Sequence, residues 1–290
     1  MDLPKLSVII PAKNEADGLS LLLPTLLEIL PNTEIIVVND GSTDHTLGIC
    51  AQYSVHVVNH LYPKGNGAAV KSGTRAAKGE ILLFMDADGQ HKPADIPALL
   101  NKFDEGYDMV VGARTPGSQA NTQRAVANDI FSRFATWMVG QKVEDLTSGF
   151  RVVDAKKFRK FLYLLPNGFS YPTTITMSFF RSGYNVTYVP IHTPKRIGIS
   201  HLQPLRDGVR FLLIIIKVGT LYSPQKLFLP ISVGFFGVGF SYYLYTYLTM
   251  GRFTNMSALL FISSILTFLI GIVSEQVSAL HYKDSDISDD

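Results

Sequence analysis

The chain has 290 residues, enough for one large domain or two small ones with a substantial core. Its formal net charge is only +2 and the body has no basic patch interleaved with aromatic residues, which argues against nucleic acid as a partner. A single cysteine, Cys50, excludes an intrachain disulfide and multi-cysteine metal sites, and fits a reducing compartment. We interpret Cys50 as an unreactive thiol in the core.

Apolar residues are distributed unevenly and divide the chain into a body and a membrane tail. Hydrophobic residues make up 47% of the chain and charged residues 17%, and the apolar excess lies after Arg210. The N-terminus enters the first expected strand without the charged and apolar regions of a signal peptide, so we expect the body in the cytosol. The predicted organisation is a body of residues 1–203, a juxtamembrane helix of residues 204–222, a transmembrane hairpin of residues 226–280 and an acidic disordered tail of residues 281–290.

Strands and helices are expected to alternate through the first part of the body. Five short apolar runs have the composition of buried strands: residues 6–10, 34–38, 55–58, 81–85 and 109–111. The helices expected after them are a Leu-rich one that Pro24 interrupts, one capped by Ser42 or Thr43 that runs to about Tyr53, one that ends at Ala77, and one from Pro93 to Glu105. This alternation predicts an α/β fold, a parallel-rich sheet flanked by helices.

Two carboxylates, Asp86 and Asp88, directly follow the apolar run Ile81–Met85. Ligands collect at the carboxyl ends of strands in open α/β sheets, and residues two apart on a strand point to the same face. Two close carboxylates are tolerated most easily around a divalent cation, and oxygen ligands favour Mg²⁺ or Mn²⁺. A turn built from Asp and Gly at a strand end is the alternative interpretation.

The sequence Lys64-Gly65-Asn66-Gly67 opens an expected helix after the third strand. It follows the third strand and lacks the final glycine of a dinucleotide fingerprint, so a Rossmann cofactor is not expected. No Walker A motif occurs in the sequence either. A helix N-terminus with Lys64 beside it could favour an anionic diphosphate. A simple helix entry with a solvated lysine remains the alternative.

Four motifs in this order resemble glycosyltransferase family two: Pro11-Ala-Lys-Asn-Glu15, Asn39-Asp-Gly-Ser-Thr-Asp44, Asp86-Ala-Asp-Gly-Gln-His91 and Leu146-Thr-Ser-Gly-Phe-Arg151. Within that family the chain is similar to the polyprenyl-phosphate sugar transferases, the group that includes dolichol-phosphate mannose synthase. The resemblance spans roughly Leu6 to Ser200. It implies a GT-A fold, a nucleotide-sugar donor, a divalent metal and a lipid-phosphate acceptor.

The resemblance also implies roles for individual residues. It assigns the nucleotide pocket to Pro11, Ala12, Asn14, Glu15, Asp40, Asp86 and Ala87, the metal to Asp86, Asp88 and Gln90, and catalysis to Asp86, Asp88 and Arg114. Lys64 joins the expected nucleotide site through its place beside the helix N-terminus. The chain departs from many relatives at Asn39, where they have aspartate. It departs from the mannose synthases at Gly89, where they carry a bulkier residue, and this weakens any inference about the sugar.

A polyprenyl phosphate acceptor would need cationic clamps rather than a general base, because its second ionisation lies near pH 6 and the nucleophile is already an anion at neutral pH. The family supplies such clamps at Arg114, Arg151 and Arg196, with Ser148 and Ser200 as lesser donors, and arginine suits the task through its two-pronged geometry. Each arginine alone could instead be a surface charge.

Residues 121–140 are expected to be helical, and we interpret Trp137 there as a core residue. The adjacent Arg-Trp pair of processive polysaccharide synthases is missing, since three residues separate Arg133 from Trp137. This favours a single transfer over chain extension.

The C-terminal part has the pattern of a membrane anchor. On a helix over residues 205–221, Arg206, Arg210 and Lys217 share one face, as in a helix lying in a membrane interface; a buried helix with a charged edge is the alternative. Two apolar runs, at about 227–249 and 257–278, are long enough to span a bilayer. Their connection carries only Arg252, whereas several cations precede the first run, so the body and both termini are expected in the cytoplasm.

These inferences together predict an inverting, metal-dependent transferase of the cytoplasmic (inner) membrane. It would move one sugar from a UDP- or GDP-linked donor to a polyprenyl phosphate at the cytoplasmic face. Two alternatives remain: transfer to another membrane lipid such as a diacylglycerol, or a catalytically silent membrane subunit that binds a nucleotide sugar. The sugar, the base, the length of the lipid and the oligomeric state, a homo-oligomer included, stay open.

Overall fold

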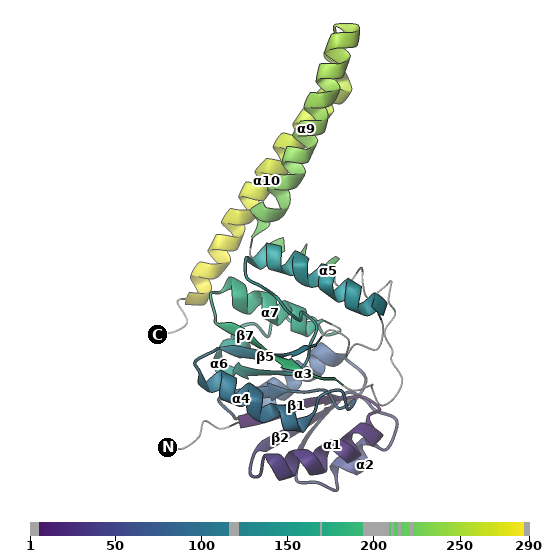
Figure 1. Cartoon of the computed structure of the whole chain (residues 1–290), viewed down its shortest axis with the longest axis vertical. Coiled ribbons are helices and arrows are strands. Elements are labelled where there is room, and N and C mark those ends of the chain that lie inside the picture. The colour runs from purple at the N-terminus through teal and green to yellow at the C-terminus, as the bar shows by residue number, and fades with distance from the viewer. Residues whose placement is uncertain are drawn as a thin grey trace. The chain divides into compact units, whose positions relative to one another are not determined.

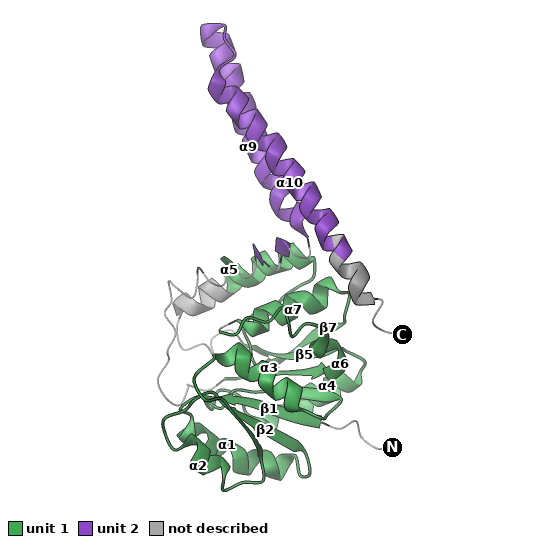
Figure 2. Cartoon of the chain, turned by 180° about the vertical axis from the view of Figure 1, so that it is seen from behind, with its two compact units in different colours: residues 1–214 green, residues 215–290 purple. Residues whose placement is uncertain are grey.

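The computed structural model describes residues 6–115, 122–168, 170–193 and 223–286, together with residues 209, 212–213, 216–217 and 219–220 (Figure 1). The side chains of residues 122–128, 279 and 281–286 are outside this description. The chain forms two compact units, Met1–Ile214 and Ile215–Asp290 (Figure 2).

A seven-stranded sheet is the centre of the first unit, with the strand order β3-β2-β1-β4-β6-β5-β7. The strands are β1 (Leu6–Ala12), β2 (Glu34–Asn39), β3 (His56–Asn59), β4 (Ile81–Phe84), β5 (Met109–Arg114), β6 (Arg151–Asp154) and β7 (Val186–Ile191). All five expected strands are present, and the α/β fold with a mostly parallel sheet is confirmed. Strand β6 is the exception to the parallel arrangement, because it runs antiparallel to both β4 and β5.

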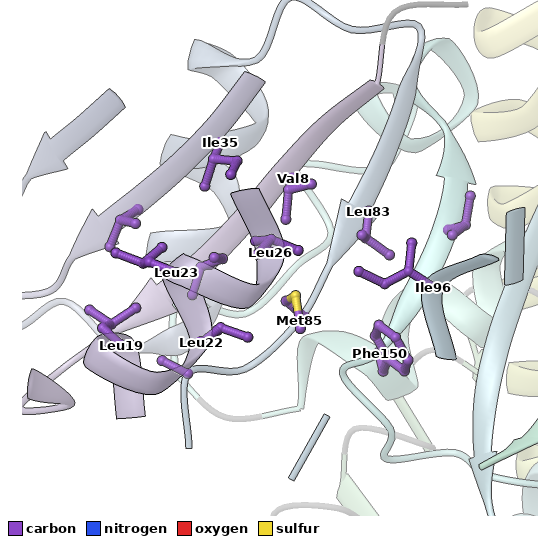
Figure 3. Close-up of a cluster of buried hydrophobic side chains, with 14 of the residues drawn as sticks. Val8, Leu19, Leu22, Leu23, Leu26, Ile35, Leu83, Met85, Ile96 and Phe150 are labelled. Carbon is purple, nitrogen blue, oxygen red and sulfur yellow. The ribbon is translucent and has the colours of Figure 1, made fainter. Parts of the chain in front are cut away.

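Helices cover both faces of the sheet (Figure 1). The helices of this unit are α1 (Ala16–Ile29), α2 (Thr46–Cys50), α3 (Asn66–Ala76), the 3₁₀ helix η1 (Pro93–Asp95), α4 (Ile96–Asp104), α5 (Thr122–Val139), α6 (Ala155–Lys160) and α7 (Tyr171–Arg181). Helix α5 packs against α7. Side chains alternate along each strand, so Val8 and Ile10 pack with α1 while Ile9 packs with α3 and α7 on the opposite face. Figure 3 shows the first of these two clusters, in which Leu19, Leu23 and other α1 residues pack against the strands.

Three local expectations are corrected. Helix α1 continues through Pro24, which lies on the exposed side of the helix. Helix α2 starts at Thr46, after His45 rather than after Ser42 or Thr43, and Asp44 Oδ1 accepts the Thr46 N–H at 3.0 Å. Trp137 is 46% exposed and stacks on Phe134 instead of lying in the core.

The second unit contains two long apolar helices, α9 (Pro224–Met250) and α10 (Asn255–Asp286). Both are long and apolar enough to cross a membrane, and only 11% and 17% of their most apolar windows are buried, so the apolar side chains face outward. At 1.5 Å per residue α9 is about 40 Å long, and a bilayer core is about 30 Å thick. This is the expected hairpin, and its apolar surface indicates membrane anchoring.

Polar and small residues join the two helices of the hairpin. Ser232 and Ser264 each donate a hydrogen bond of 2.9 Å to the other's carbonyl oxygen. Gly251, with φ of 62°, ends α9. Helix α10 runs to Asp286, past the predicted start of a disordered tail at residue 281. Most of the predicted juxtamembrane helix lies outside the described residues.

Candidate active site

The ends of several strands meet at one edge of the sheet. Strands β1, β2, β4 and β5 all end there, and β6 begins there because it runs in the opposite direction. Strand β1 lies between β2 and β4, so the order of the parallel strands reverses at β1 and β4. Ligands of open α/β sheets bind at such a switch point.

A tight turn over Asp86–His91 follows β4 at this point. The Asp86 N–H donates to His91 Nδ1 at 2.9 Å, and the Gln90 N–H donates to Asp88 Oδ1 at 3.1 Å. Gly89 has φ of 76°, a conformation that glycine adopts without strain. Asp86 and Asp88 therefore both lie in this turn, after the end of β4, and not on the strand, as the sequence predicts.

His91 stabilises the turn from the protein interior. Its ring is buried and stacks on Phe150, with the ring centroids 5.0 Å apart. Burial lowers the pKa of His91 to about 4, so the imidazole is neutral at neutral pH. Because Nδ1 accepts the Asp86 N–H, the proton lies on Nε2. Sequence reasoning includes His91 in a motif but gives it no role.

Arg114, at the end of β5, is held by Asp145. Nε and Nη2 of Arg114 donate to Oδ2 and Oδ1 of Asp145, both at 2.8 Å. Burial alone would raise the pKa of Asp145, but Arg114 holds it below its ordinary value. Burial acts to lower the pKa of Arg114, but Asp145 raises it above its ordinary value. The charges of Asp86 and Asp88 contribute smaller effects in the same direction as Asp145.

Sequence reasoning missed Asp145. Its Oδ1 also accepts the N–H groups of Thr147 and Ser148, at 3.0 and 3.2 Å. An Asp side chain often accepts the backbone N–H two residues further on in a turn, so the Asp145–Thr147 spacing could have indicated this turn. Asp145 thus fixes both Arg114 and the loop before β6.

Arg151 and Ser148 are both buried in the first unit. Arg151 is 0% exposed, and its guanidinium donates to the Ser148 carbonyl and, at 3.1 Å, to Thr176 Oγ1. Burial lowers the pKa of Arg151. Ser148 is 2% exposed and its Oγ accepts the Phe150 N–H at 3.3 Å. Both side chains are therefore engaged within the protein, and their predicted contact with an acceptor phosphate stays a prediction.

Asp40 is also engaged within the protein. It is 4% exposed and accepts the N–H groups of Lys64 and Gly65, each at 2.8 Å, while His60 Nδ1 lies 2.7 Å from its Oδ1. Burial acts to raise the pKa of Asp40, but these hydrogen bonds hold it below its ordinary value. Asp40 therefore shapes the glycine loop, and its predicted contact with a base or ribose stays a prediction.

The N-terminus of α3 is closed by another loop. The N–H groups of Gly67 and Ala68 donate to the carbonyl oxygens of Gly168 and Asn167, at 3.0 and 2.8 Å. A Cβ on Gly67 would lie 1.9 Å from the Pro166 carbonyl oxygen, so only glycine fits. These donors are not available for a diphosphate. Lys64 is exposed, with its Nζ 5.5 Å from the centroid of the Tyr62 ring.

The remaining predicted nucleotide residues surround the ends of β1 and β4. Asn14 and Glu15 line a hollow that Asp17, Gly18, Asp44 and His45 complete. Pro11 and Ala12 are the last residues of β1. Ala87 is buried, and its carbonyl oxygen would lie 1.9 Å from a Cβ on Gly18, which shows how closely α1 approaches the Asp86–His91 turn. Arg196 and Ser200 lie outside the described residues.

Comparison with known proteins decides the family. The family model described as Glycosyl transferase family 2 matches residues 7–163, more than half of the chain. The chain belongs to glycosyl transferase family 2. A second model, the GtrB C-terminal hairpin, matches residues 223–280, the part that contains α9 and most of α10.

Relatives of this family 2 transferase include polyprenyl-phosphate enzymes. It is 29% identical to the polyprenol monophosphomannose synthase of Mycolicibacterium smegmatis, over 68% of this chain and 80% of that one. It is 28% identical to the dolichyl-phosphate hexose transferase of Haloferax volcanii, over 73% and 93% of the two chains. These findings confirm the resemblance seen in the sequence motifs.

A solved structure has the same fold. The glucosyl-3-phosphoglycerate synthase of Mycobacterium tuberculosis, crystallised with Mn²⁺, uridine diphosphate and phosphoglyceric acid, aligns with a TM-score of 0.60. The alignment covers 74% of this transferase and 78% of the synthase, at 19% identity. The likeness confirms the GT-A type architecture.

The candidate metal ligands of this transferase are oxygen donors. No group of three or more His, Cys, Asp or Glu side chains gathers as a metal site among the described residues. Asp86, Asp88 and Gln90 could still hold Mg²⁺ or Mn²⁺, since such ions are often bound by one or two carboxylates together with substrate phosphates. The donor chemistry therefore fits a hard cation.

Proposed function

We propose that this transferase moves a single sugar from a UDP- or GDP-linked donor to a polyprenyl phosphate, with inversion, at the cytoplasmic face of a membrane. One observation carries the proposal. The Asp86–His91 turn and Arg114 converge at the switch point of the sheet, in a chain that ends in an apolar hairpin. The names of the two sequence relatives support the acceptor class.

Asp86, Asp88 and Gln90 are proposed to hold Mg²⁺ or Mn²⁺ at the donor diphosphate. The metal would stabilise the negative charge that develops on the leaving diphosphate. The synthase with the same fold was crystallised with Mn²⁺ and also with Mg²⁺. The role of His91 would be to fix the backbone of Asp86 by accepting its N–H.

The donor nucleotide is proposed to lie along the ends of β1 and β4. Asn14 has φ of 55°, and its backbone is fixed by an N–H bond of 2.9 Å to Ser42 Oγ. This places Asn14 and Glu15 in the wall of the hollow next to the Asp86–His91 turn. The proposed nucleotide contacts are therefore Asn14 and Glu15, with Pro11, Ala12 and Ala87 supplying backbone.

The acceptor phosphate is proposed to bind Arg114, with Arg196 and Ser200 as further contacts. A phosphate monoester is an anion at neutral pH, so it needs no general base to attack. Direct attack by this oxygen on the anomeric carbon is a single displacement and inverts the configuration. Asp145 aligns Arg114 for this task, and the buried Arg151 supports the wall of the site from inside.

The hairpin would hold the site at the membrane surface where a polyprenyl phosphate is found. The excess of lysine and arginine before α9 favours a cytoplasmic body and termini. A single transfer is favoured because the adjacent Arg-Trp pair of processive synthases is missing.

The test is a matrix of donors and acceptors. The full chain, reconstituted in lipid vesicles, is incubated with UDP- and GDP-sugars and Mn²⁺, with undecaprenyl phosphate, undecaprenol or diacylglycerol as acceptor, and products are identified by mass spectrometry. We expect a glycosyl phosphate lipid when undecaprenyl phosphate is the acceptor, and no product with undecaprenol or diacylglycerol. A product with diacylglycerol or free polyprenol would overturn the acceptor class, and donor binding without any product would favour a silent subunit.

A further inference from the structure

A second pocket opens beside Asp86, and none of its other residues has a role in the proposed reaction. Its lining comes from the start of α3, the turn after β4, the loop before β6 and the start of α7: Asn66, Asp86, Thr147, Gly149, Ser170, Tyr171 and Pro172. The empty volume is about 340 Å³ and includes its open mouth. All lining residues belong to the first unit.

Ser170 is the unusual residue in this lining. It precedes α7, where a serine hydroxyl normally caps the helix, yet its side chain makes no capping hydrogen bond. It is 3% exposed, and its Oγ has no hydrogen-bond partner among the described residues. A buried hydroxyl that is left unsatisfied costs free energy, so its partner is expected to be a ligand or water.

The backbone of Ser170 has an unusual conformation at this position in the lining. Its φ of 84° and ψ of 23° lie in the left-handed region, which is unfavourable for a residue with a side chain. Such outliers cluster at functional sites, where the surrounding structure maintains them. The strain here accompanies an uncapped helix start and an unsatisfied hydroxyl in the same residue.

The charges around the pocket favour a neutral ligand. The Asp86 carboxylate is part of the lining, and a Cβ on Gly149 would lie 2.9 Å from its Oδ2, so the carboxylate rests on the Gly149 backbone. The buried guanidinium of Arg151 lies below, 5.7 Å from the centroid of the Tyr171 ring and close enough for its charge to act on Asp86. One negative and one positive charge leave little net attraction for an ion.

We propose that this pocket binds the hydroxyl groups of the transferred sugar and that Ser170 and Asn66 determine which sugar is accepted. A sugar hydroxyl can accept from Ser170 Oγ or the Asn66 amide and donate to Asp86. A phosphate group would face the Asp86 carboxylate. The assignment rests on the proposed function, because it takes the sugar from the donor whose diphosphate lies at the Asp86–His91 turn.

Two substitutions distinguish the effect of losing the hydroxyl from the effect of relieving the backbone strain. Ser170→Ala removes the hydroxyl and keeps the strain, whereas Ser170→Gly removes the hydroxyl and relieves the strain. Ser182→Ala, at the opposite end of α7 and outside the pocket, is the matched control. If the alanine variant fails to fold, the glycine variant still carries the test.

Binding is measured by calorimetry without acceptor, using UDP-glucose, UDP-galactose, UDP-N-acetylglucosamine and GDP-mannose, with UDP and GDP alone as references. For the preferred donor we expect both Ser170 variants to weaken binding about tenfold and to change the ratio between epimeric sugars, while binding of the free diphosphate changes by less than about twofold. Ser182→Ala should match the wild type. Asn66→Ala should act in the same direction as the Ser170 variants.

Three results would overturn the proposal. Sugar-nucleotide binding could remain unchanged in both Ser170 variants, or the free diphosphate could lose as much affinity as the sugar nucleotide. The KM for undecaprenyl phosphate could instead rise while donor binding stays constant, which would give the pocket to the acceptor phosphate. If the wild type binds sugar nucleotides but forms no lipid product, the proposed function fails, and the binding comparison still decides the role of the pocket.

Discussion

Asp145 holds Arg114 through two parallel hydrogen bonds of 2.8 Å, and its oxygens also fix the backbone before β6. The side chain of Asp145 is 2% exposed and that of Arg114 is 24% exposed, so the pair joins the interior to the site. An arginine held in this way loses less conformational entropy when it binds an anion.

The Asp145–Arg114 pair can be tested by Asp145→Asn. The substitution leaves a partly buried guanidinium without its counter-charge, so we expect the free energy of unfolding to fall by about 1–3 kcal/mol. Transfer should fall roughly tenfold or more because Arg114 is misplaced. The control is Asp129→Asn, which breaks an exposed ion pair with Arg133 of 3.0 Å and should change stability by less than about 1 kcal/mol. Equal effects of the two variants would deny Asp145 a special role.

Asp88→Asn tests the proposed metal site. It keeps the size of the side chain and removes its charge, so we expect metal-dependent transfer to fall by about a hundredfold or more. The thermal midpoint should change little, because the Gln90 N–H can still donate to an asparagine oxygen. Transfer is measured against Mn²⁺ and Mg²⁺ concentration. Wild-type transfer that persists in excess chelator would remove the metal from the mechanism.

Arg151→Lys tests whether the buried arginine is structural. Lysine cannot reproduce the fork that donates to Ser148 and Thr176, so the free energy of unfolding should fall by about 1–3 kcal/mol. The KM for undecaprenyl phosphate of the folded protein should stay within about twofold, because the side chain has no access to a phosphate. A tenfold rise in this KM at unchanged stability would restore Arg151 as a phosphate clamp.

The fold could be predicted from the sequence where strands are uninterrupted apolar runs, as in β1, β2 and β4. Strand β6 starts with Arg151 and has four residues, and β7 contains Pro190 and is mostly half-buried, so neither carries a clear strand pattern. Both pair with β5, which is far from them in the sequence. Their order and direction depend on tertiary packing that local propensity does not encode.

The residues of the site that lie at the ends of these clear strands could also be predicted from the sequence. Asp86 and Asp88 lie just after β4 and Arg114 is the last residue of β5, so their position at the sheet edge follows from the topology. Asp145 is 31 residues from Arg114 in the sequence, so their pairing is a product of the fold. The motif around Arg151 suggested a phosphate contact, but the packing of α7 over its guanidinium decides its burial.

Asp40→Asn should destabilise the glycine loop and alter the response to acid. The three hydrogen bonds favour the charged form of Asp40 and hold its pKa below 3.8, against the effect of burial. Its stabilising contribution is therefore fully present above pH 3.8 and is lost as the pH falls through the lower pKa of the folded state. We expect a loss of about 1–3 kcal/mol at neutral pH and a shallower acid limb in the unfolding curve. Asp104→Asn, an exposed carboxylate, is the control, and an unchanged acid limb in Asp40→Asn would contradict the expectation.

The last prediction concerns the orientation of the hairpin, which follows from the lengths of α9 and α10 and from the cations that precede them. Because Cys50 is the only cysteine, a Cys50→Ala background allows single thiols to be placed at will. We expect a thiol at the exposed start of α10, Asn255→Cys, to react with a membrane-impermeant maleimide only from the side of the membrane opposite the cytoplasm. A thiol in the body, Leu61→Cys, where the native side chain is 93% exposed, should react only from the cytoplasmic side. Reaction of both thiols from the same side would show that the helices do not span, and the reverse pattern would place the body outside the cytoplasm.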